Sequence, residues 1–294
     1  MFLMTNLKNI EVKKDVDLKN FCTFKIGGKA KFLYIVKNNT QLIDVCKYLK
    51  LHNIKYKIIG LGANLLFDDN GFNGAIIVNK SNKIIFKNNS VLVDGGVTIT
   101  GLIMKCCLRS LSGFEALSGI PSTIGGGITN NVGSFNCSIA DFVEYVECYS
   151  KKNLNKKLIL TNADCQFNYR NSIFKSSDYI ITKAKLNLKT DNPTLIKQRI
   201  IQYVEKKKST QPLNYPSAGS VFKRGNIIPA KVIDELGLKG TRIGGAEIST
   251  KHAGFIVNTN SATSNDVKEL IALIKTKVYD ATGENLETEI ELVE

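Results

Sequence analysis

The residues best suited to bind a phosphate group lie in a glycine-rich segment between positions 119 and 133. This segment reads Gly-Ile-Pro-Ser-Thr-Ile-Gly-Gly-Gly-Ile-Thr-Asn-Asn-Val-Gly and carries no charged side chain. Because its five glycines have no side chains, its backbone N–H groups can approach a ligand closely, and successive amides in such a loop form an anion-binding concavity. The segment predicts a phosphate- or pyrophosphate-binding loop, and a purely structural loop is the alternative.

A second glycine loop, Gly60-Leu-Gly-Ala-Asn64, follows an apolar run at residues 54–59. It does not complete the dinucleotide-binding pattern G-x-G-x-x-G, because Leu65 stands where the third glycine is required. On its own, the loop is better explained by a tight turn that needs a positive φ. Its position after a predicted strand keeps cofactor binding open.

Two polar side chains elsewhere are candidates for catalysis. Arg170 lies in Asn-Tyr-Arg-Asn-Ser, six positions after its nearest acidic neighbour, Asp164. An arginine without a local partner can hold a carboxylate or an enolate, although a surface arginine with a distant partner is the alternative. Ser220 ends the small-residue turn at 217–220, which does not match the nucleophile elbow G-x-S-x-G. Its hydroxyl is a proton donor or merely a turn hydroxyl.

The segment Leu-Glu-Thr-Glu-Ile-Glu-Leu at 286–292 alternates strictly between apolar or threonine residues and glutamates. Such alternation predicts a strand with its carboxylates, Glu289 among them, on one face. A half-solvated strand is one interpretation. If the acidic face instead lined a cleft, crowding and desolvation would raise the pKa of one carboxyl group and make it a proton donor.

The remaining composition limits the class of protein. The chain has 294 residues, 43% of them hydrophobic, which excludes an intrinsically disordered chain. No apolar run reaches the length of a membrane helix and the start lacks the pattern of a secretory signal, so we expect a cytoplasmic protein that does not associate with a membrane. Seven cysteines without a C-x-x-C pair predict reduced thiols, and His52 and His252 support no metal site.

The formal net charge of +14 admits an enzyme for anionic substrates or a non-catalytic protein that binds RNA or DNA. Only five of the 40 basic residues are arginine, the side chain that proteins binding in a DNA groove use most to contact bases. The glycine loop of residues 119–133 is also uncharged. We therefore favour an enzyme, with nucleic-acid binding as the alternative from a different class.

These candidate residues need elements to position them. Apolar spacing predicts helices at residues 42–49 (capped by Asn39 or Thr40), 98–111, 195–204, 229–236 and 264–279. It predicts strands at residues 54–59, 75–78, 83–86, 90–93, 141–150, 157–161, 179–188, 254–258 and 286–293. Prolines concentrate between residues 193 and 216, where we place a domain boundary.

Seven motifs in a fixed order resemble one family over nearly the whole chain, the UDP-N-acetylenolpyruvoylglucosamine reductases (UDP-N-acetylmuramate dehydrogenases) in their shorter form. The motifs are Thr-Phe-Lys-Ile-Gly-Gly at 23–28, Gly-Leu-Gly-Ala-Asn-Leu-Leu at 60–66, the loop at 119–133, Tyr-Arg-Asn-Ser at 169–172, Pro-Ser-Ala-Gly-Ser-Val-Phe-Lys at 216–223, the segment 244–258 and Leu-Glu-Thr-Glu at 286–289.

The resemblance implies an α+β fold class: a two-lobed FAD-binding fold of the vanillyl-alcohol-oxidase type with a C-terminal α/β substrate-binding domain. The implied boundaries are 1–79 for the first lobe, joined by the final strand at 286–294, then 80–190 for the second lobe and 205–285 for the substrate domain. Non-covalent FAD, NADPH as reductant and UDP-N-acetylglucosamine enolpyruvate as substrate follow from the same resemblance. We also expect a monomer that binds no metal. Another FAD-dependent oxidoreductase of this fold, acting on a different hydroxy acid or sugar, is the alternative.

The resemblance also implies roles for individual residues. Arg170 and Glu289 would stabilise enolate charge, and Ser220 would be the general acid, with Lys223 polarising it. Tyr169, Arg170, Lys223 and Asn131 would contact the substrate. The implied cofactor-binding residues are Ile26, Gly27, Gly60, Gly62, Ala63, Asn64, Leu65, Gly119, Ile120, Pro121, Ser122, Thr123, Gly125, Gly126 and Gly133.

Overall fold

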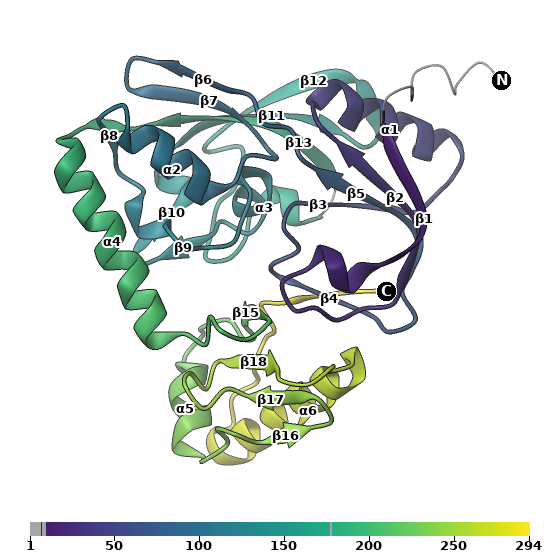
Figure 1. Ribbon diagram of the computed structural model, residues 1–294, viewed down its shortest axis with the longest axis vertical. Coiled ribbons are helices and arrows are strands. Elements are labelled where there is room, and N and C mark those ends of the chain that lie inside the picture. Colours follow the sequence, from purple (N-terminus) through teal and green to yellow (C-terminus); the bar gives the residue numbers. More distant parts are fainter. Residues whose placement is uncertain (1–6, 8–9, 177) are drawn as a thin grey trace. The chain divides into compact units, whose positions relative to one another are not determined.

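The computed structural model describes residue 7, residues 10–176 and residues 178–294 (Figure 1). The chain divides into two compact units. Unit 1 contains the described part of Met1–Val12, Leu33–Gly60 and Ala75–Lys206, and unit 2 contains Lys13–Phe32, Leu61–Gly74 and Lys207–Glu294. Each unit therefore combines segments that are far apart in the sequence.

A four-stranded sheet has the order β1-β2-β5-β3, built from Glu11–Asp17, Lys29–Val36, Phe72–Asn79 and Tyr56–Ile59. Helix α1 (Asn39–Leu51) precedes β3, which is parallel to β5. The predicted cap of this helix was wrong by one residue. The Asn38 side-chain oxygen accepts the Gln41 N–H at 2.9 Å, because Asn38 has the extended backbone conformation that an N-cap requires.

The larger sheet of unit 1 is antiparallel and confirms the strands predicted between residues 83 and 188 to within a few residues. Its order is β12-β11-β13-β7-β6, formed by Asn153–Thr161, Val143–Ser150, Tyr179–Asn187, Ser90–Asp94 and Ile84–Lys87. Helices α2 (Ile99–Cys107) and α3 (Ile124–Thr129) contribute to the same buried core, and α3 contacts β7 and β13. Because α3 is part of the glycine-rich segment, this core fixes the position of that segment.

Helix α2 ends earlier than its apolar pattern predicted. Leu108 is 81% exposed, and Ser110 has φ +57°, so the pattern through residue 111 does not continue as a helix. Leu111 is instead buried in the short strand β8 (Leu111–Ser112), which pairs with β14 (Lys189–Thr190). Pairing with a distant segment thus overrides the local helical periodicity.

The remaining short elements of unit 1 surround the glycine-rich segment. They are the hairpin strands β9 (Gly133–Ser134) and β10 (Cys137–Ser138) and the 3₁₀ helices Glu115–Leu117, Ile139–Asp141 and Ile173–Ser176. Helix α4 (Pro193–Thr210) confirms the helix predicted there. It begins where the Thr194 N–H donates to the Asn192 side-chain oxygen at 2.8 Å.

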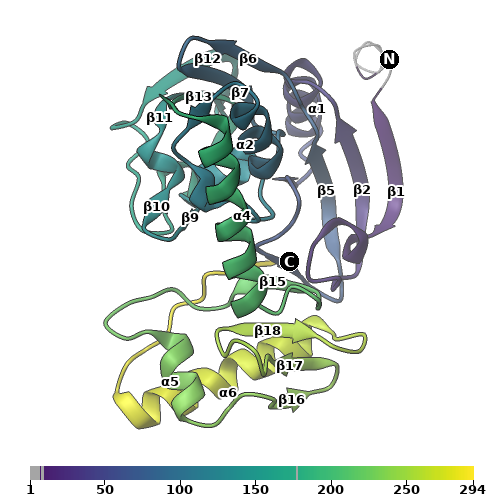
Figure 2. The ribbon, with the colours of Figure 1, turned by 60° about the vertical axis from the view of Figure 1, so that its left-hand side comes forward.

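The C-terminal part of unit 2 is a four-stranded antiparallel sheet with helices. Its order is β15-β18-β17-β16, formed by Ser217–Ser220, Phe255–Asn258, Ala246–Ile248 and Arg242–Ile243. Helix α6 (Ser264–Thr282) contacts β16, β17 and α5 (Pro229–Glu235), and Figure 2 shows it running along the sheet. A capping box of Thr263 and Asp266 starts α6, and Gly283 with φ +73° ends it.

The prediction of one continuous strand at residues 286–293 was wrong. Residues 287–289 lie antiparallel to residues 221–223, whereas β19 (Glu291–Val293) pairs in parallel with β4 (Leu65–Phe67). The chain bends at Ile290 because it changes partner and direction there. As a result the alternation of burial breaks, with Ile290 buried, Leu292 43% exposed and Val293 buried.

Unit 2 also contains the 3₁₀ helix Leu18–Phe21 and the first of the seven motifs. The Thr23 hydroxyl donates to the Ser217 carbonyl at 2.7 Å, and the Asn258 side chain donates to the Phe24 carbonyl at 3.2 Å. The motifs at 23–28, 216–223 and 244–258 therefore lie together in this unit, although Thr23 and Ser217 are more than 190 positions apart in the sequence. Within the described residues, no helix has both the length and the apolarity to cross a membrane.

Candidate active site

Gly60, the first residue of the loop at 60–64, contacts the 119–133 segment inside unit 1. A Cβ atom added to Gly60 would lie 2.3 Å from the Thr123 hydroxyl oxygen, so the loops can pass this closely only because residue 60 is glycine. The same Thr123 hydroxyl caps α3 by accepting the Gly126 N–H at 3.3 Å. The structure therefore brings Gly60 and Thr123, both predicted to bind the cofactor, into contact.

Most glycines of the 119–133 segment have a structural reason to be glycine. Gly119 has φ +77°, and a Cβ at Gly133 would lie 2.9 Å from the Cys137 carbonyl oxygen. The Gly125 N–H donates to the Gly95 carbonyl at 2.8 Å, and a Cβ at Gly125 would lie 3.1 Å from that oxygen. These positions are accounted for by the fold alone.

Gly126 is different. It lies in α3, and a Cβ there would come no closer than 3.4 Å to any neighbour, the Ser122 hydroxyl oxygen. Helices disfavour glycine relative to alanine by about 1 kcal/mol, so the fold alone does not explain this residue. A Cβ at this position would make only ordinary contacts, with the Ser122 and Thr123 hydroxyl oxygens, and its absence lets a ligand approach the backbone more closely.

The other predicted residues of this loop are held by backbone hydrogen bonds. The Ser122 carbonyl accepts the Ile99 N–H at 2.9 Å, and the Ile120 N–H donates to the Leu117 carbonyl at 3.2 Å. Pro121, between them, has no N–H to satisfy. The start of α2 thus fixes the loop on one side.

In unit 2, the predicted cofactor residues lie in two closely packed segments, at 26–27 and 62–65. Gly27 has φ +134° and Gly62 has φ +64°, and a Cβ at Gly62 would lie 2.3 Å from the Phe21 carbonyl oxygen. The Asn64 side chain donates to the Glu289 carbonyl at 3.0 Å, and Leu65 begins β4. Ile26 is buried, and Ala63 is half-buried. The segment at 62–65 therefore holds the backbone at Glu289.

Arg170 lines a pocket of unit 1 with a volume of about 560 Å³. Asn131 and Tyr169, the two predicted substrate contacts of this unit, line the same pocket. The full lining is Asn131, Ser138, Ala140, Asp141, Asn162, Phe167, Asn168, Tyr169 and Arg170. The guanidinium of Arg170 donates to the Gly133 carbonyl at 2.9 Å, which ties it to the end of the glycine-rich segment.

Ser220 and Glu289 lie on adjacent segments of unit 2. The Glu289 N–H donates to the carbonyl of Val221, the residue after Ser220, at 2.7 Å. Gly219 precedes Ser220 with φ +81°, and a Cβ at Gly219 would meet nothing within 4 Å. The predicted proton donor and the predicted carboxyl group are therefore close in the same unit.

Lys223 has a partner that the sequence did not predict. The ammonium group of Lys223 pairs with the Glu287 carboxylate, and the backbone N–H of Lys223 donates to the backbone carbonyl of Glu287 at 2.9 Å. The Lys223 side chain is 18% exposed and that of Glu287 is 72% exposed, so the pair lies at the edge of the solvent. The alternation of glutamates at 287, 289 and 291 was the only sequence signal for this contact.

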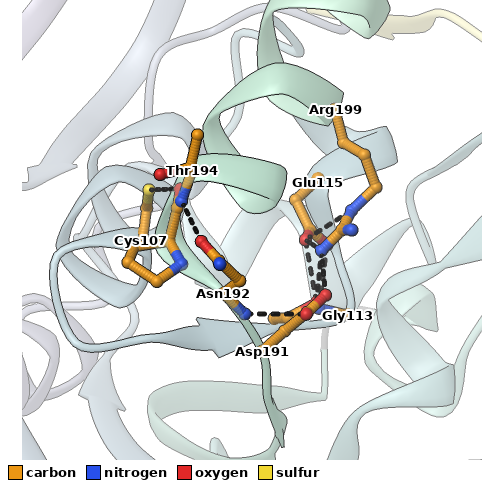
Figure 3. Close-up of polar contacts among 9 residues, drawn as sticks. Cys107, Gly113, Glu115, Asp191, Asn192, Thr194 and Arg199 are labelled. Atoms are coloured by element: carbon orange, nitrogen blue, oxygen red, sulfur yellow. Dashed lines mark hydrogen bonds and ion pairs between the residues drawn. The ribbon is translucent and has the colours of Figure 1, made fainter.

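Glu115 is a second residue whose role was missed. It is buried, and Figure 3 shows its carboxylate facing Arg199 of α4 and the Gly113 N–H, at 2.9 Å and 2.8 Å. Burial alone would raise the pKa of Glu115, but hydrogen bonds from backbone amides, Arg199 and Ser112 outweigh burial and lower it. Arg199 also pairs with Asp191 just before α4. This network anchors the turn that leads into the glycine-rich segment.

Comparisons with known proteins place this geometry in a family. Residues 30–152 match the model of an FAD binding domain, and residues 211–293 match that of the UDP-N-acetylenolpyruvoylglucosamine reductase C-terminal domain. The UDP-N-acetylenolpyruvoylglucosamine reductase of Caldicellulosiruptor bescii is 41% identical over 98% of this chain and 93% of that protein. The chain belongs to the UDP-N-acetylenolpyruvoylglucosamine reductase family. The Thermotoga maritima reductase is 39% identical over 92% of this chain and 94% of its own length.

A solved structure agrees over the whole length. The crystal structure of UDP-N-acetylenolpyruvylglucosamine reductase from Thermus caldophilus superposes with a TM-score of 0.82 and 30% identity, covering 97% of this chain and all of that one. The predicted fold class is thereby confirmed: α+β, with an FAD-binding fold and a C-terminal substrate domain of this reductase family. Gly60 and the 119–133 segment lie in the matched FAD binding domain, and Ser220, Lys223 and Glu289 lie in the matched C-terminal domain.

Proposed function

We propose that this chain catalyses the NADPH-dependent, FAD-mediated reduction of UDP-N-acetylglucosamine enolpyruvate to UDP-N-acetylmuramate, a step of peptidoglycan precursor synthesis. The observation that carries the proposal is the 41% identity, over 98% of the chain, to a reductase of this name. The +14 net charge is consistent with a substrate and a reductant that both carry phosphate groups.

The residues present fit FAD. Gly126, a glycine that the packing does not require in an uncharged loop, would let a pyrophosphate approach backbone amides, and Gly60 contacts Thr123 of the same loop within unit 1. FAD, when bound, supplies a hydride acceptor and donor that couples NADPH oxidation to substrate reduction. The residues proposed to hold it without a covalent bond are Ile26, Gly27, Gly60, Gly62, Ala63, Asn64, Leu65, Gly119, Ile120, Pro121, Ser122, Thr123, Gly125, Gly126 and Gly133.

Arg170 is proposed to hold the carboxylate of the enolpyruvyl group. Reduction of the double bond at its CH₂ carbon is possible only if negative charge can build up on that carboxylate, and a fixed guanidinium stabilises such charge. Arg170 is suited to this role because it lines a polar pocket and its guanidinium is oriented by the Gly133 carbonyl. Glu289 is proposed to help stabilise the same charge.

Ser220 is proposed to donate its hydroxyl proton to the carbon next to the carboxylate. A serine hydroxyl is a weak acid, so it needs nearby positive charge or a relay to become an effective donor. Lys223, three residues along and largely buried, is the proposed source of positive charge, with its ammonium held by Glu287. Tyr169 and Asn131 are proposed to contact the substrate from the pocket of unit 1.

The finer organisation of the protein is also proposed. Residues 1–79 with 286–294 would form one FAD-binding lobe, 80–190 the second lobe and 205–285 the substrate-binding domain. We propose that the enzyme works as a monomer in the cytoplasm, without nucleic-acid partners or a metal, and that it contributes through cell-wall synthesis to cell shape and division.

A visible spectrum followed by NADPH oxidation tests the proposed function. The purified protein should be yellow, and it should consume NADPH rapidly only when UDP-N-acetylglucosamine enolpyruvate is added. A protein that binds FAD but oxidises NADPH equally with and without this substrate would be a different flavoenzyme. A colourless protein that cannot be reconstituted with FAD would contradict the proposal entirely.

A further inference from the structure

Arg170 occupies a strained position at the tip of a tight turn. Asn168 and Asn171 exchange both of their backbone hydrogen bonds, at 3.0 Å and 3.1 Å, which leaves Tyr169 and Arg170 as the two tip residues. The φ angle of Arg170 is +51°, in the left-handed region that residues with a side chain rarely adopt. Such a conformation persists only where surrounding groups hold it, and it is concentrated at functional sites.

Two side chains from outside the turn hold its backbone. The Asn131 side-chain N–H donates to the Asn168 carbonyl at 2.9 Å, and the Lys175 ammonium donates to the carbonyl of Arg170 itself at 3.2 Å. One side chain therefore holds the carbonyl at the start of the turn, and the other holds the carbonyl of the strained residue.

Asn131 is itself fixed on its other side. It is buried, and its side-chain oxygen accepts the Ala140 N–H at 3.2 Å. Both ends of its amide are thus bonded to the protein, which makes it a link between the glycine-rich segment and the Arg170 turn. A side chain used in this way supports the Arg170 turn, in addition to the substrate contact proposed for it.

The guanidinium of Arg170 completes the arrangement. One terminal nitrogen donates to the Gly133 carbonyl, and a Cβ added at Gly133 would lie 3.3 Å from the other, a tighter contact than most Cβ atoms make. If the turn relaxed to a right-handed φ, the direction of the Arg170 side chain would change and this bond would be lost. The position of the guanidinium in the pocket thus depends on what holds the backbone.

We propose that Asn131 and Lys175 are positioning residues that keep Arg170 in its strained turn, so that its guanidinium is pre-set for the substrate carboxylate. This inference rests on the proposed function, in which Arg170 meets that carboxylate. Lys175 bears the sharper prediction, because it is half-buried and contacts the Arg170 carbonyl directly.

The test uses the FAD-loaded enzyme and compares Lys175→Met and Asn131→Ala with wild type. Stopped-flow measurements follow two rates separately: loss of visible absorbance on adding NADPH, and its return on adding UDP-N-acetylglucosamine enolpyruvate. Both substitutions should leave the first rate nearly unchanged and slow the second by about tenfold to a hundredfold, the effect of a misplaced group. Lys175→Arg should recover most of the rate, and Lys156→Met, at an exposed lysine of β12, should match wild type.

A double-mutant cycle separates positioning from general damage. In an Arg170→Ala background, Lys175→Met should slow the second rate by less than about twofold, because two residues that act through one group are not additive. The proposal would be overturned if Lys175→Met slowed the second rate by the same factor with and without Arg170. It would also be overturned if Lys175→Met and Asn131→Ala had normal rates while Arg170→Ala was slow. A wild-type enzyme that never acts on the enolpyruvyl substrate would instead contradict the proposed function.

A crystal structure of the Lys175→Met variant decides the geometric part without reference to activity. Arg170 should leave the left-handed region, and its guanidinium should leave the Gly133 carbonyl. An unchanged Arg170 turn in that variant would show that Lys175 is not required to hold it. Lys175→Met also carries the test if the buried Asn131→Ala variant fails to fold.

Discussion

At the scale of single residues, Gly126 separates the requirements of the fold from those of the proposed ligand. Its neighbours Gly125 and Gly127 are constrained by contacts: a Cβ at Gly127 would lie 2.9 Å from the Ile99 side chain. At Gly126 the same atom would be in ordinary contact with its surroundings. A glycine that the fold does not need, in an uncharged loop, is best explained by a group that approaches the backbone.

We therefore predict that Gly126→Asp folds but does not retain FAD. The carboxylate would stand where a pyrophosphate would approach the loop and would repel it, whereas a Cβ at this position makes only ordinary contacts. The ratio of visible to ultraviolet absorbance of the purified variant, together with its melting curve, measures both effects. Gly225→Asp, at an exposed glycine with nothing within 4 Å, is the matched control and should stay yellow. Full flavin content in Gly126→Asp would show that the loop assignment is wrong.

Ser220 allows a prediction about the proton that it is proposed to donate. Ser220→Ala should leave the reaction with NADPH nearly intact, since that step does not need this proton, and should slow reoxidation by the enolpyruvyl substrate by about a hundredfold or more. Ser220→Cys should recover part of the loss, because a thiol can also release a proton. Stopped-flow spectroscopy decides between the roles: equal slowing of both steps would indicate a folding or binding defect, and unchanged reoxidation would leave Ser220 as a turn hydroxyl.

At the scale of elements, the Glu115–Arg199 pair joins the turn before the glycine-rich segment to helix α4. The two residues are 84 positions apart, and the exposed fraction of the Glu115 side chain is only 5%. Figure 3 shows Gly113 and Asp191 in the same network, and the Ser112 hydroxyl also donates to the Glu115 carboxylate. The position of the loop thus depends on a contact outside it.

The lowered pKa of Glu115 predicts how this anchor responds to pH. The pKa of Glu115 in the folded protein lies below its ordinary value of 4.5. The stabilisation that its carboxylate provides is therefore fully present above pH 4.5 and is lost as the pH falls through the pKa of Glu115 in the folded protein. Glu115→Gln should lower the free energy of unfolding at pH 7 by about 2 kcal/mol, the worth of hydrogen bonds to a charged group. Urea unfolding of both proteins between pH 7 and pH 3 should show the difference shrinking below pH 4.5. A difference that stays constant with pH would exclude this assignment.

At the scale of the whole molecule, the proposed FAD would be held by segments from many parts of the chain. The implied contacts range from Ile26 to Gly133 along the sequence. A ligand that binds the folded chain and not the unfolded chain stabilises the whole fold by mass action. Cofactor binding and global stability should therefore be coupled.

We predict that FAD binds without a covalent bond and that its removal lowers the melting temperature. Acid precipitation should leave the flavin in the supernatant, and re-adding FAD to the apoprotein at about a hundred times its Kd should restore about 2.7 kcal/mol of stability. Calorimetry with increasing FAD measures this shift, with FMN as a comparison ligand. A yellow pellet after acid treatment would contradict non-covalent binding.

Local patterns were sufficient to predict the longer helices, the strands of the larger sheet and the residue types of the candidate site, but not β1, β2 or α3. The apolar spacing at residues 264–279 matches α6, and the alternation at residues 179–188 matches β13, because burial of one face repeats with the period of each element. The order of the seven motifs was sufficient to identify the family. The roles of Arg170, Ser220 and Glu289 remain predictions for the experiments above.

Features that depend on distant partners could not be predicted in this way. The segment 286–293 bends at Ile290 because its two halves pair with different strands, and the Lys223–Glu287 and Glu115–Arg199 contacts join residues that no local period relates. The strain at Arg170 and the side chains that hold it belong to the same class. Periodicity and composition are properties of neighbouring residues, whereas a hydrogen bond or an ion pair is decided by which segments the folded chain places within about 3 Å of each other.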